Sequence, residues 1–132
     1  MLRQFSYDTV DSTNRLAIER VQSGVARPPF IVQAATQSAG RGRYGRAWAS
    51  PRGGLWFSVA WAAAAPLGQY ETLPLVVGAG LAATLEHALG LACAVKWPND
   101  VLIDQRKVGG VLCQMELTPA PVSYTHLTLP TN

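Results

Sequence analysis

One segment restricts the fold of this 132-residue chain more than any other. Residues 36–54 hold five glycines, four arginines and one proline. Because glycine and proline interrupt regular elements, we expect a long loop here. The segments on either side, 30–35 and 55–61, contain β-branched and aromatic residues typical of strands. A loop of this length between two strands of a compact domain usually carries function.

The positive charge of the chain is concentrated in the same loop. Its net charge is +3, from 11 basic and 8 acidic side chains. Arg41, Arg43, Arg46 and Arg52 fall within 12 residues that contain no acid, and without them the balance is slightly negative. A charge confined to one loop fits a small anionic ligand. A nucleic-acid surface usually spreads its charge over a face or a helix.

Composition places the chain among globular proteins. Apolar residues make up 48% and charged residues 14%, which excludes a disordered polyelectrolyte. The two cysteines, Cys93 and Cys113, are too few for a disulfide framework and lack the spacing of a metal site. The first residues form no apolar signal segment, and glycines and a proline interrupt the uncharged stretch 53–70. We therefore expect a cytoplasmic protein without a membrane span.

The order of the expected elements indicates an α+β fold. Capping residues at 11–14 predict a helix over about 13–23, ended by Gly24. Helical spacing of apolar residues predicts a buried helix over about 71–89, with Pro74 in its first turn. Three short strands follow at 93–96, 101–103 and 111–115, the last two forming a hairpin. We expect a mixed or antiparallel sheet with the helices on one face.

Alternating glycine and arginine at 40–46 suggests an anion site. Glycine lets backbone N–H groups approach a ligand closely, and arginine adds planar forks that match phosphate or carboxylate oxygens. A solvated flexible loop, or one that touches RNA, is the alternative. Trp48 follows the loop and is either a lid that stacks on a planar group or an anchor for the end of the loop.

Three other segments carry polar groups that suit a ligand. Ser12-Thr13-Asn14 can cap a helix, and residues not used for capping can bind a ligand. Asn99 and Asp100 follow a strand and can orient a lysine or hold a hard cation, although they are also ordinary turn residues. Lys107 precedes two glycines that would let it lie beside a ligand, or it is a surface residue of a hairpin.

In this order, the four motifs closely resemble the biotin protein ligases, also called biotin–[acetyl-CoA-carboxylase] ligases. The resemblance runs from about residue 8 to residue 116, and it rests on Ser12-Thr13-Asn14, Gln37 to Trp48, Lys96 to Asp100, and Arg106 to Val111. It implies the class II synthetase-like fold of the biotin/lipoate ligase catalytic domain. A related lipoate or octanoate ligase, and an RNA-binding module built on the arginine loop, are the alternatives.

Enzymes of this family use ATP and Mg²⁺ to convert biotin to biotinyl-5′-AMP and then transfer biotin to a lysine of a carrier domain. The resemblance therefore implies a biotin carboxyl carrier protein as the partner. Because the motifs begin within a dozen residues of Met1, we expect no DNA-binding domain and no DNA partner. A homodimer of the full-length enzyme is also compatible with the resemblance.

The resemblance also assigns roles to individual residues. It implies that Lys107 and Arg43 are catalytic. It implies a biotin pocket formed by Ser12, Thr13, Asn14, Gln37, Gly40, Arg41, Gly42, Arg43 and Lys107. It implies an ATP and adenylate site formed by Arg43, Arg46, Trp48, Asn99 and Asp100, with Asp100 the candidate Mg²⁺ ligand.

The same comparison predicts how the chain divides. Residues 1–116 are expected to be the first part of the family's catalytic domain. Residues 117–132 do not resemble the family and are expected to be disordered or artefactual. Because the family's catalytic domain continues past this point, we expect a fragment with weak or no ligase activity alone.

Overall fold

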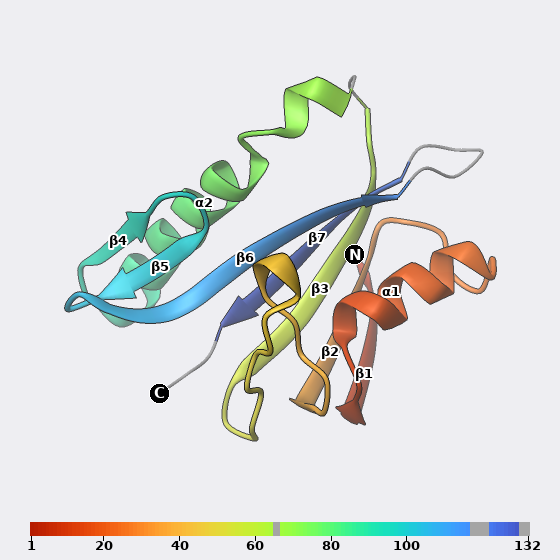
Figure 1. Cartoon of the computed structure of the whole chain (residues 1–132), viewed down its shortest axis with the longest axis horizontal. Helices are drawn as coiled ribbons and strands as arrows, with labels where there is room; N and C mark the ends of the chain where they lie inside the picture. Colours follow the sequence, from red (N-terminus) through yellow and green to blue (C-terminus); the bar gives the residue numbers. More distant parts are fainter. Residues whose placement is uncertain (65–66, 117–121, 130–132) are drawn as a thin grey trace.

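The computed structural model describes residues 1–64, 67–116 and 122–129, and there seven strands form one sheet in the order β1-β2-β3-β7-β6-β5-β4 (Figure 1). The mixed α+β fold predicted from the sequence is confirmed. The elements are β1 (Arg3–Val10), α1 (Thr13–Gln22), β2 (Phe30–Gln37), the 3-10 turn η1 (Arg43–Gly45), β3 (Leu55–Ala62), the 3-10 turn η2 (Leu67–Tyr70), α2 (Leu73–Leu89), β4 (Cys93–Lys96), β5 (Asp100–Ile103), β6 (Arg106–Glu116) and β7 (Val122–Leu129).

Strand β1 was missed by the sequence analysis. It pairs parallel to β2, with Phe5 opposite Val32 and Tyr7 opposite Ala34, whereas the other strand pairs are antiparallel. Its residues alternate between exposed and half-buried, because it lies at the edge of the sheet. Only two large apolar side chains, Phe5 and Tyr7, lie in its interior, so its period-two signal is weak.

Helix α1 forms as the capping residues predict. The hydroxyl oxygen of Ser12 accepts a hydrogen bond from the backbone N–H of Arg15 at 3.3 Å, which satisfies one of the free donors of the first turn. The helix then packs Ala17 against Phe30, Val32 and Ala60, all fully buried. This core holds α1 against β2 and β3.

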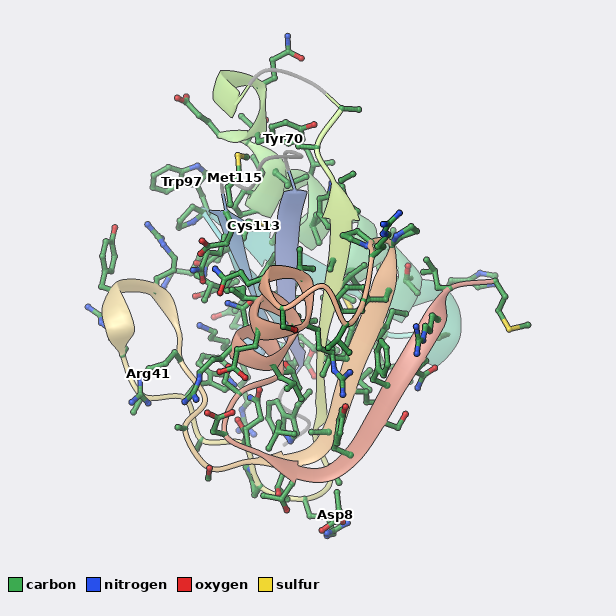
Figure 2. All side chains as sticks on the ribbon, turned by 90° about the vertical axis from the view of Figure 1, so that its right-hand side faces the viewer. Asp8, Arg41, Tyr70, Trp97, Cys113 and Met115 are labelled. Carbon is green, nitrogen blue, oxygen red and sulfur yellow. The ribbon has the colours of Figure 1, made fainter. Side chains whose placement is uncertain are left out.

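The two helices lie on opposite faces of the sheet, so the expectation that they share one face was wrong. Figure 1 shows α1 in front of the strands and α2 passing behind β5 and β6. Successive side chains of a strand point to opposite faces. Gln114 of β6 contacts α1, whereas Cys113 and Met115 border the start of α2 near Tyr70 (Figure 2).

Helix α2 begins and ends where the sequence predicts, with a proline in its first turn and Gly90 in the left-handed conformation after its last. The expectation that it is a buried helix was wrong. Only Gly78 and Ala82 are buried, and Val76 is 62% exposed. Among the described residues, Gly68–Leu89 is the one helical segment long and apolar enough to cross a membrane. One such segment is weak evidence, because a core helix of a soluble protein passes the same test.

Residues 122–129 form β7, which pairs with both β3 and β6 in the middle of the sheet. This part of the segment 117–132, which was expected to be disordered or artefactual, forms a strand; that it lies outside the family's domain stays a prediction. Two neighbouring strands offer it backbone partners along both edges, and Val122, Tyr124 and Thr125 are residue types that favour strands. Residues 117–121 and 130–132 lie outside the described part of the chain. The expected domain boundary at residue 116 stays a prediction.

The glycine and arginine loop folds back on itself. The backbone N–H of Trp48 donates to the carbonyl oxygen of Gly40 at 2.9 Å, and the backbone N–H of Gly42 donates to the carbonyl oxygen of Arg46 at 2.8 Å. A Cβ atom at residue 40 would lie 2.6 Å from the carbonyl oxygen of Trp48, so only glycine fits there. The loop carries η1 and lies over the same face of the sheet as α1 (Figure 1).

Candidate functional site

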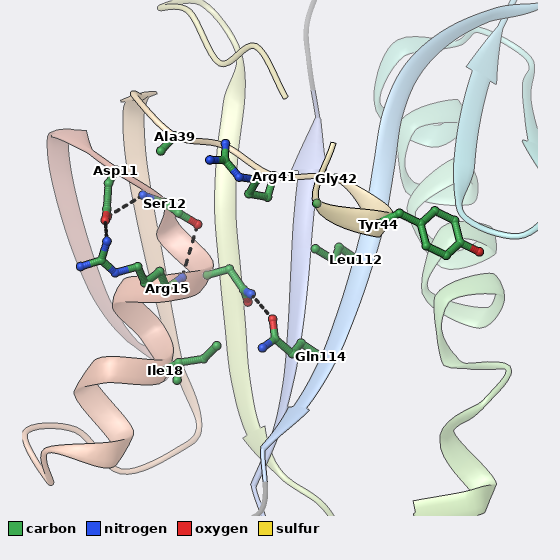
Figure 3. Close-up of a pocket in the computed structure, with 12 residues that line it drawn as sticks. Asp11, Ser12, Arg15, Ile18, Ala39, Arg41, Gly42, Tyr44, Leu112 and Gln114 are labelled. Atoms are coloured by element: carbon green, nitrogen blue, oxygen red, sulfur yellow. Dashed lines mark hydrogen bonds and ion pairs between the residues drawn. The ribbon is translucent and has the colours of Figure 1, made fainter. Parts of the chain in front are cut away.

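The first pocket lies between the start of α1, the glycine loop and β6, and has a volume of about 520 Å³ (Figure 3). Its size lies in the range of small-molecule sites. Polar groups come mainly from α1 and the loop, and Ile18 and Leu112 supply apolar surface. The pocket is lined by Asp11, Ser12, Asn14, Arg15, Ile18, Ala39, Arg41, Gly42, Tyr44, Gly45, Leu112 and Gln114.

Thr13 and Gln37, both predicted to bind the ligand, do not line this pocket. Thr13 is fully buried, and both its N–H and its hydroxyl donate to Oε1 of Gln37, at 2.8 and 3.1 Å. Its hydroxyl also lies 2.8 Å from that of Ser58 on β3, and Gln37 donates to the hydroxyl of Ser50 at 2.9 Å. This buried network joins α1, β2, β3 and the end of the loop, and so supports the pocket from behind.

Asn14 crosses the pocket toward β6. Its Nδ2 donates to Oε1 of Gln114 at 2.8 Å, although the two residues are 100 positions apart in the sequence. The side chain of Asn14 is buried, and its Oδ1 has no hydrogen-bond partner in the described part of the chain. Arg15, at the rim of the pocket, is engaged by Asp11 and by Glu19. The hydrogen bond to Glu19, with the charges of Asp11 and Glu19, raises the pKa of Arg15.

The second pocket adjoins the first and is strongly cationic, with a volume of about 350 Å³. The two share Arg41, Gly42, Tyr44 and Leu112, so the loop and β6 form walls of both. Four cationic side chains and a single carboxylate are among its lining residues, which are Arg41, Gly42, Arg43, Tyr44, Arg46, Ala47, Trp48, Pro98, Asn99, Asp100, Lys107, Gly110, Val111 and Leu112. Such a surface favours a phosphate-bearing ligand.

Lys107, Asp100 and Trp48 meet in the second pocket. The lysine Nζ lies 2.7 Å from Oδ1 of Asp100 and 4.6 Å from the centroid of the Trp48 ring. Gly110 lies beneath them, and a Cβ atom there would make ordinary contacts with Lys107 and Trp48. The indole Nε1 of Trp48 is buried and has no hydrogen-bond partner among the described residues.

The turn before β5 is fixed to β6 by Asn99. Its carbonyl oxygen accepts from the N–H of Val111 at 2.9 Å, and its Nδ2 donates to the carbonyl oxygen of Val111 at 3.1 Å. This places Asp100 at the edge of the second pocket. In the described ranges, no group of three or more His, Cys, Asp or Glu side chains could hold a metal ion.

The structure brings together most of the predicted site residues and separates a few. Thr13, Gln37 and Gly40 lie behind the pocket walls and support them. Arg52, in the same loop, donates to Asp8 at 2.6 Å instead of lining a pocket, and this contact lowers the pKa of Asp8. The predicted residues that line a pocket are Ser12, Asn14, Arg41, Gly42, Arg43, Arg46, Trp48, Asn99, Asp100 and Lys107.

Several lining residues were missed by the sequence analysis. Leu112 and Gln114 follow Gly110 at the period of two that places them on one face of β6, so the strand pattern contained a usable signal. Tyr44 adopts a left-handed conformation, with φ of 59°, and stacks under the guanidinium of Arg43 at 4.9 Å. The positions of Ile18 and Ala39 depend on how α1 and the loop pack.

Comparison with known proteins identifies the family. A model described as the biotin/lipoate A/B protein ligase family matches residues 6–122. The chain belongs to this family. Its members include the bifunctional ligase/repressor BirA of Bacillus subtilis, which is 34% identical over 111 residues. That match spans 83% of this chain and 34% of the Bacillus protein.

Two further biotin ligases are similar to this chain. The biotin–[acetyl-CoA-carboxylase] ligase of Paracoccus denitrificans is 39% identical over 110 residues, or 79% of this chain and 43% of that protein. The biotin protein ligase of Aquifex aeolicus, solved in complex with biotin and ATP, superposes with a TM-score of 0.79 and 32% identity. It matches 100% of this chain and 53% of that one. The chain thus spans less than half the length of these two curated relatives.

Proposed function

We propose that this protein activates biotin with ATP and transfers it to a lysine of a biotin carboxyl carrier domain. The observation that carries the proposal is the pair of adjoining pockets, one partly apolar and one cationic, on either side of the glycine loop. Biotinyl-5′-AMP joins a weakly polar ring system and a phosphate by a short chain, and it suits such a pair. The Aquifex relative, whose solved complex contains biotin and ATP, supports this choice.

The first step brings two anions together. A carboxylate oxygen of biotin attacks the α-phosphorus of ATP, the bond to the β-phosphate breaks, and pyrophosphate leaves. Arg43 and Lys107, both lining the cationic pocket, would offset the repulsion and the charge that develops on the α-phosphate. In the second step the neutral ε-amino group of the carrier lysine attacks the acyl carbon, loses a proton, and displaces AMP.

Residues around the cationic pocket would position the nucleotide. Trp48 offers a ring face for a planar base, and Arg46 adds a further charge for the phosphates. The loop, held by its own backbone hydrogen bonds, would cover the reactive adenylate and exclude water. Thr13 and Gln37 would act on biotin only indirectly, through the buried network behind the first pocket.

Magnesium would enter with ATP. Mg²⁺ in nucleotide sites is usually held by one or two carboxylates together with phosphate oxygens and water. Asp100 is the single carboxylate lining the cationic pocket, which fits this role but not that of a cage made by the protein alone. Bound Mg²⁺ would supply further positive charge at the transferring phosphate.

The remaining expectations on partners and location are part of the proposal. The acceptor is a biotin carboxyl carrier domain, the compartment is the cytoplasm, and neither DNA nor a membrane is a partner of these 132 residues. We also propose that the full-length enzyme can form a homodimer. Binding of DNA or of lipid vesicles by the purified chain would contradict these proposals.

Calorimetric titration of the chain with biotin and with lipoate tests the substrate. We expect biotin to bind more tightly, with little dependence on salt. Because the chain is expected to have weak or no ligase activity alone, biotinyl-AMP formation on addition of Mg²⁺ and ATP is measured in the full-length enzyme. A preference for lipoate would favour the lipoate or octanoate ligase alternative. Binding of RNA that falls steeply with salt, with no binding of biotin, would favour the RNA-binding alternative.

A further inference from the structure

A row of three polar side chains runs from α1 across the first pocket to β6 and continues along that strand. Nδ2 of Asn14 donates to Oε1 of Gln114 at 2.8 Å, and Nε2 of Gln114 donates to Oε1 of Glu116 at 2.9 Å. Asn14 and Gln114 line the pocket, and Glu116 is the next residue of β6 on the same face. Neither Gln114 nor Glu116 was singled out from the sequence.

The carboxylate at the end of the row sets its direction. An ionised carboxylate can only accept hydrogen bonds, so Gln114 must turn its NH₂ group toward Glu116. Its carbonyl oxygen then faces Asn14, and Asn14 must turn its own NH₂ group toward Gln114. As a result, Oδ1 of Asn14 is held as a hydrogen-bond acceptor, buried and without a partner in the described residues.

The other acceptors at the start of α1 are already in use. The carboxylate of Asp11 accepts from the N–H of Ser12 at 2.7 Å and pairs with Arg15. The hydroxyl oxygen of Ser12 accepts from the N–H of Arg15. Leaving a buried acceptor unpaired costs free energy, and a donor on a bound ligand recovers it. Oδ1 of Asn14 is thus the buried side-chain acceptor at the start of α1 that has no donor among the described residues.

We infer that Gln114 and Glu116 are positioning residues that hold Oδ1 of Asn14 to accept an N–H group of the ligand in the first pocket. A cyclic urea, such as the ring of biotin, carries such N–H groups, whereas a dithiolane ring carries none. The row thus favours an acid that carries a cyclic urea, such as biotin, over one that carries a dithiolane, such as lipoate. This inference rests on the proposed function, because it takes biotin to be the ligand.

The experiment compares the affinities of biotin and of two N-methylated biotins, each with one ureido nitrogen blocked. Calorimetric titrations use the purified chain, and the readout is the ratio of the affinities for biotin and for a methylated ligand. We expect the wild-type chain to discriminate against at least one methylated biotin. In Gln114→Leu, Asn14 loses its orienting partner, and we expect this ratio to fall about tenfold, the effect of one hydrogen bond.

Three further variants separate positioning from general damage. Gln114→Glu should keep the wild-type ratio, because a proton shared with the carboxylate of Glu116 leaves the other oxygen at residue 114 to accept from Asn14. Glu116→Gln replaces the carboxylate, which can only accept, by an amide that can also donate, so the direction of the row is no longer set. Because Glu116 is partly exposed, this variant carries little risk to folding. We expect its ratio to fall as well. Gln33→Leu is the matched control, since Gln33 accepts from Gln4 in an exposed amide pair away from both pockets.

The outcomes separate this inference from the function on which it rests. A reduced ratio in Gln114→Leu and Glu116→Gln, restored in Gln114→Glu, supports the inference. An unchanged ratio in Glu116→Gln, or an equal loss of affinity for all ligands in Gln114→Leu, overturns it and leaves the proposed function standing. Failure of the wild-type chain to bind biotin overturns both, and it is seen before any variant is made.

Discussion

The ammonium group of Lys107 lies 2.7 Å from a carboxylate oxygen of Asp100 and above the ring of Trp48. The lysine comes from β6, the aspartate from the start of β5, and the tryptophan from the glycine loop. Their contact ties the loop to the sheet at the cationic pocket. It also leaves the lysine charge beside the place where phosphate would bind.

Replacing this lysine should affect catalysis more than binding of biotin. In the full-length enzyme, we expect Lys107→Ala to lower the rate of biotinyl-AMP formation by about 100- to 1,000-fold, the usual cost of losing one preorganised charge or donor. The measurement is biotin-dependent exchange of labelled pyrophosphate into ATP. Lys96→Ala is the matched control, because this second lysine is exposed at the end of β4 and lines neither pocket. Equal rates in the two variants would remove Lys107 from the mechanism.

Two glycines of one loop should respond differently to alanine. At residue 40 a Cβ atom would lie 2.6 Å from the carbonyl oxygen of Trp48 and 2.7 Å from the hydroxyl of Ser50. We expect Gly40→Ala to lower the free energy of unfolding by about 1–3 kcal/mol, measured by urea denaturation. At residue 42 the contacts would be ordinary, with Trp48 at 3.7 Å, so Gly42→Ala should keep the stability and weaken ligand binding. Similar unfolding curves for both variants would show that the loop tolerates a side chain at residue 40.

The buried network behind the pocket should contribute to stability. Thr13→Val removes a hydroxyl that contacts both Gln37 and Ser58, and we expect a loss of about 1–3 kcal/mol in the free energy of unfolding. Thr9→Val is the control, because Thr9 forms an exposed contact with Thr36 at 2.8 Å. Its effect should lie within about 0.5 kcal/mol. If both variants unfold at the same urea concentration, the buried network contributes no more to the free energy of unfolding than the exposed contact does.

The ion pair between Arg52 and Asp8 should be visible in a titration. The hydrogen bond and charge of Arg52 lower the pKa of Asp8 from its ordinary value of 3.8. A carboxyl whose pKa is lowered by folding stabilises the fold above its unfolded pKa, and this stabilisation is lost as the pH falls through the folded value. Both groups are exposed, so the effect on stability is small. In Arg52→Ala the Asp8 pKa, followed by carboxyl NMR, should rise toward the ordinary value, whereas Arg46→Ala should leave it unchanged.

Local sequence patterns predicted most of the elements. Caps, prolines and glycines placed the ends of both helices within about two residues, as local chemistry allows. Strands β2 to β6 were predicted from their apolar, β-branched and aromatic content. The edge strand β1 was missed, because only Phe5 and Tyr7 mark its inner face. Strand β7 was missed although Val122, Tyr124 and Thr125 are good strand formers, because its segment does not resemble the family and was expected to be disordered or artefactual.

The candidate site was predicted in outline, through four motifs whose order indicates the biotin ligase family. Sequence alone could not tell which of these residues face a ligand. Thr13 and Gln37 belong to the motifs but lie behind the pocket, because the turn from β1 into α1 directs Thr13 toward β2 and β3. Gln114 lies in no motif but lines the pocket, because the sheet brings β6 beside α1.

The sequence by itself determined the local conformations, the concentration of charge in one loop, and the family. The first two properties depend on residues close together in the chain, and the family shows in the order of four motifs along it. Tertiary structure alone decided that α1 and α2 lie on opposite faces, that α2 is largely exposed, and that Asn14 meets Gln114. Such contacts depend on the order of strands in the sheet, which joins distant segments through backbone hydrogen bonds that any residue except proline can donate and accept.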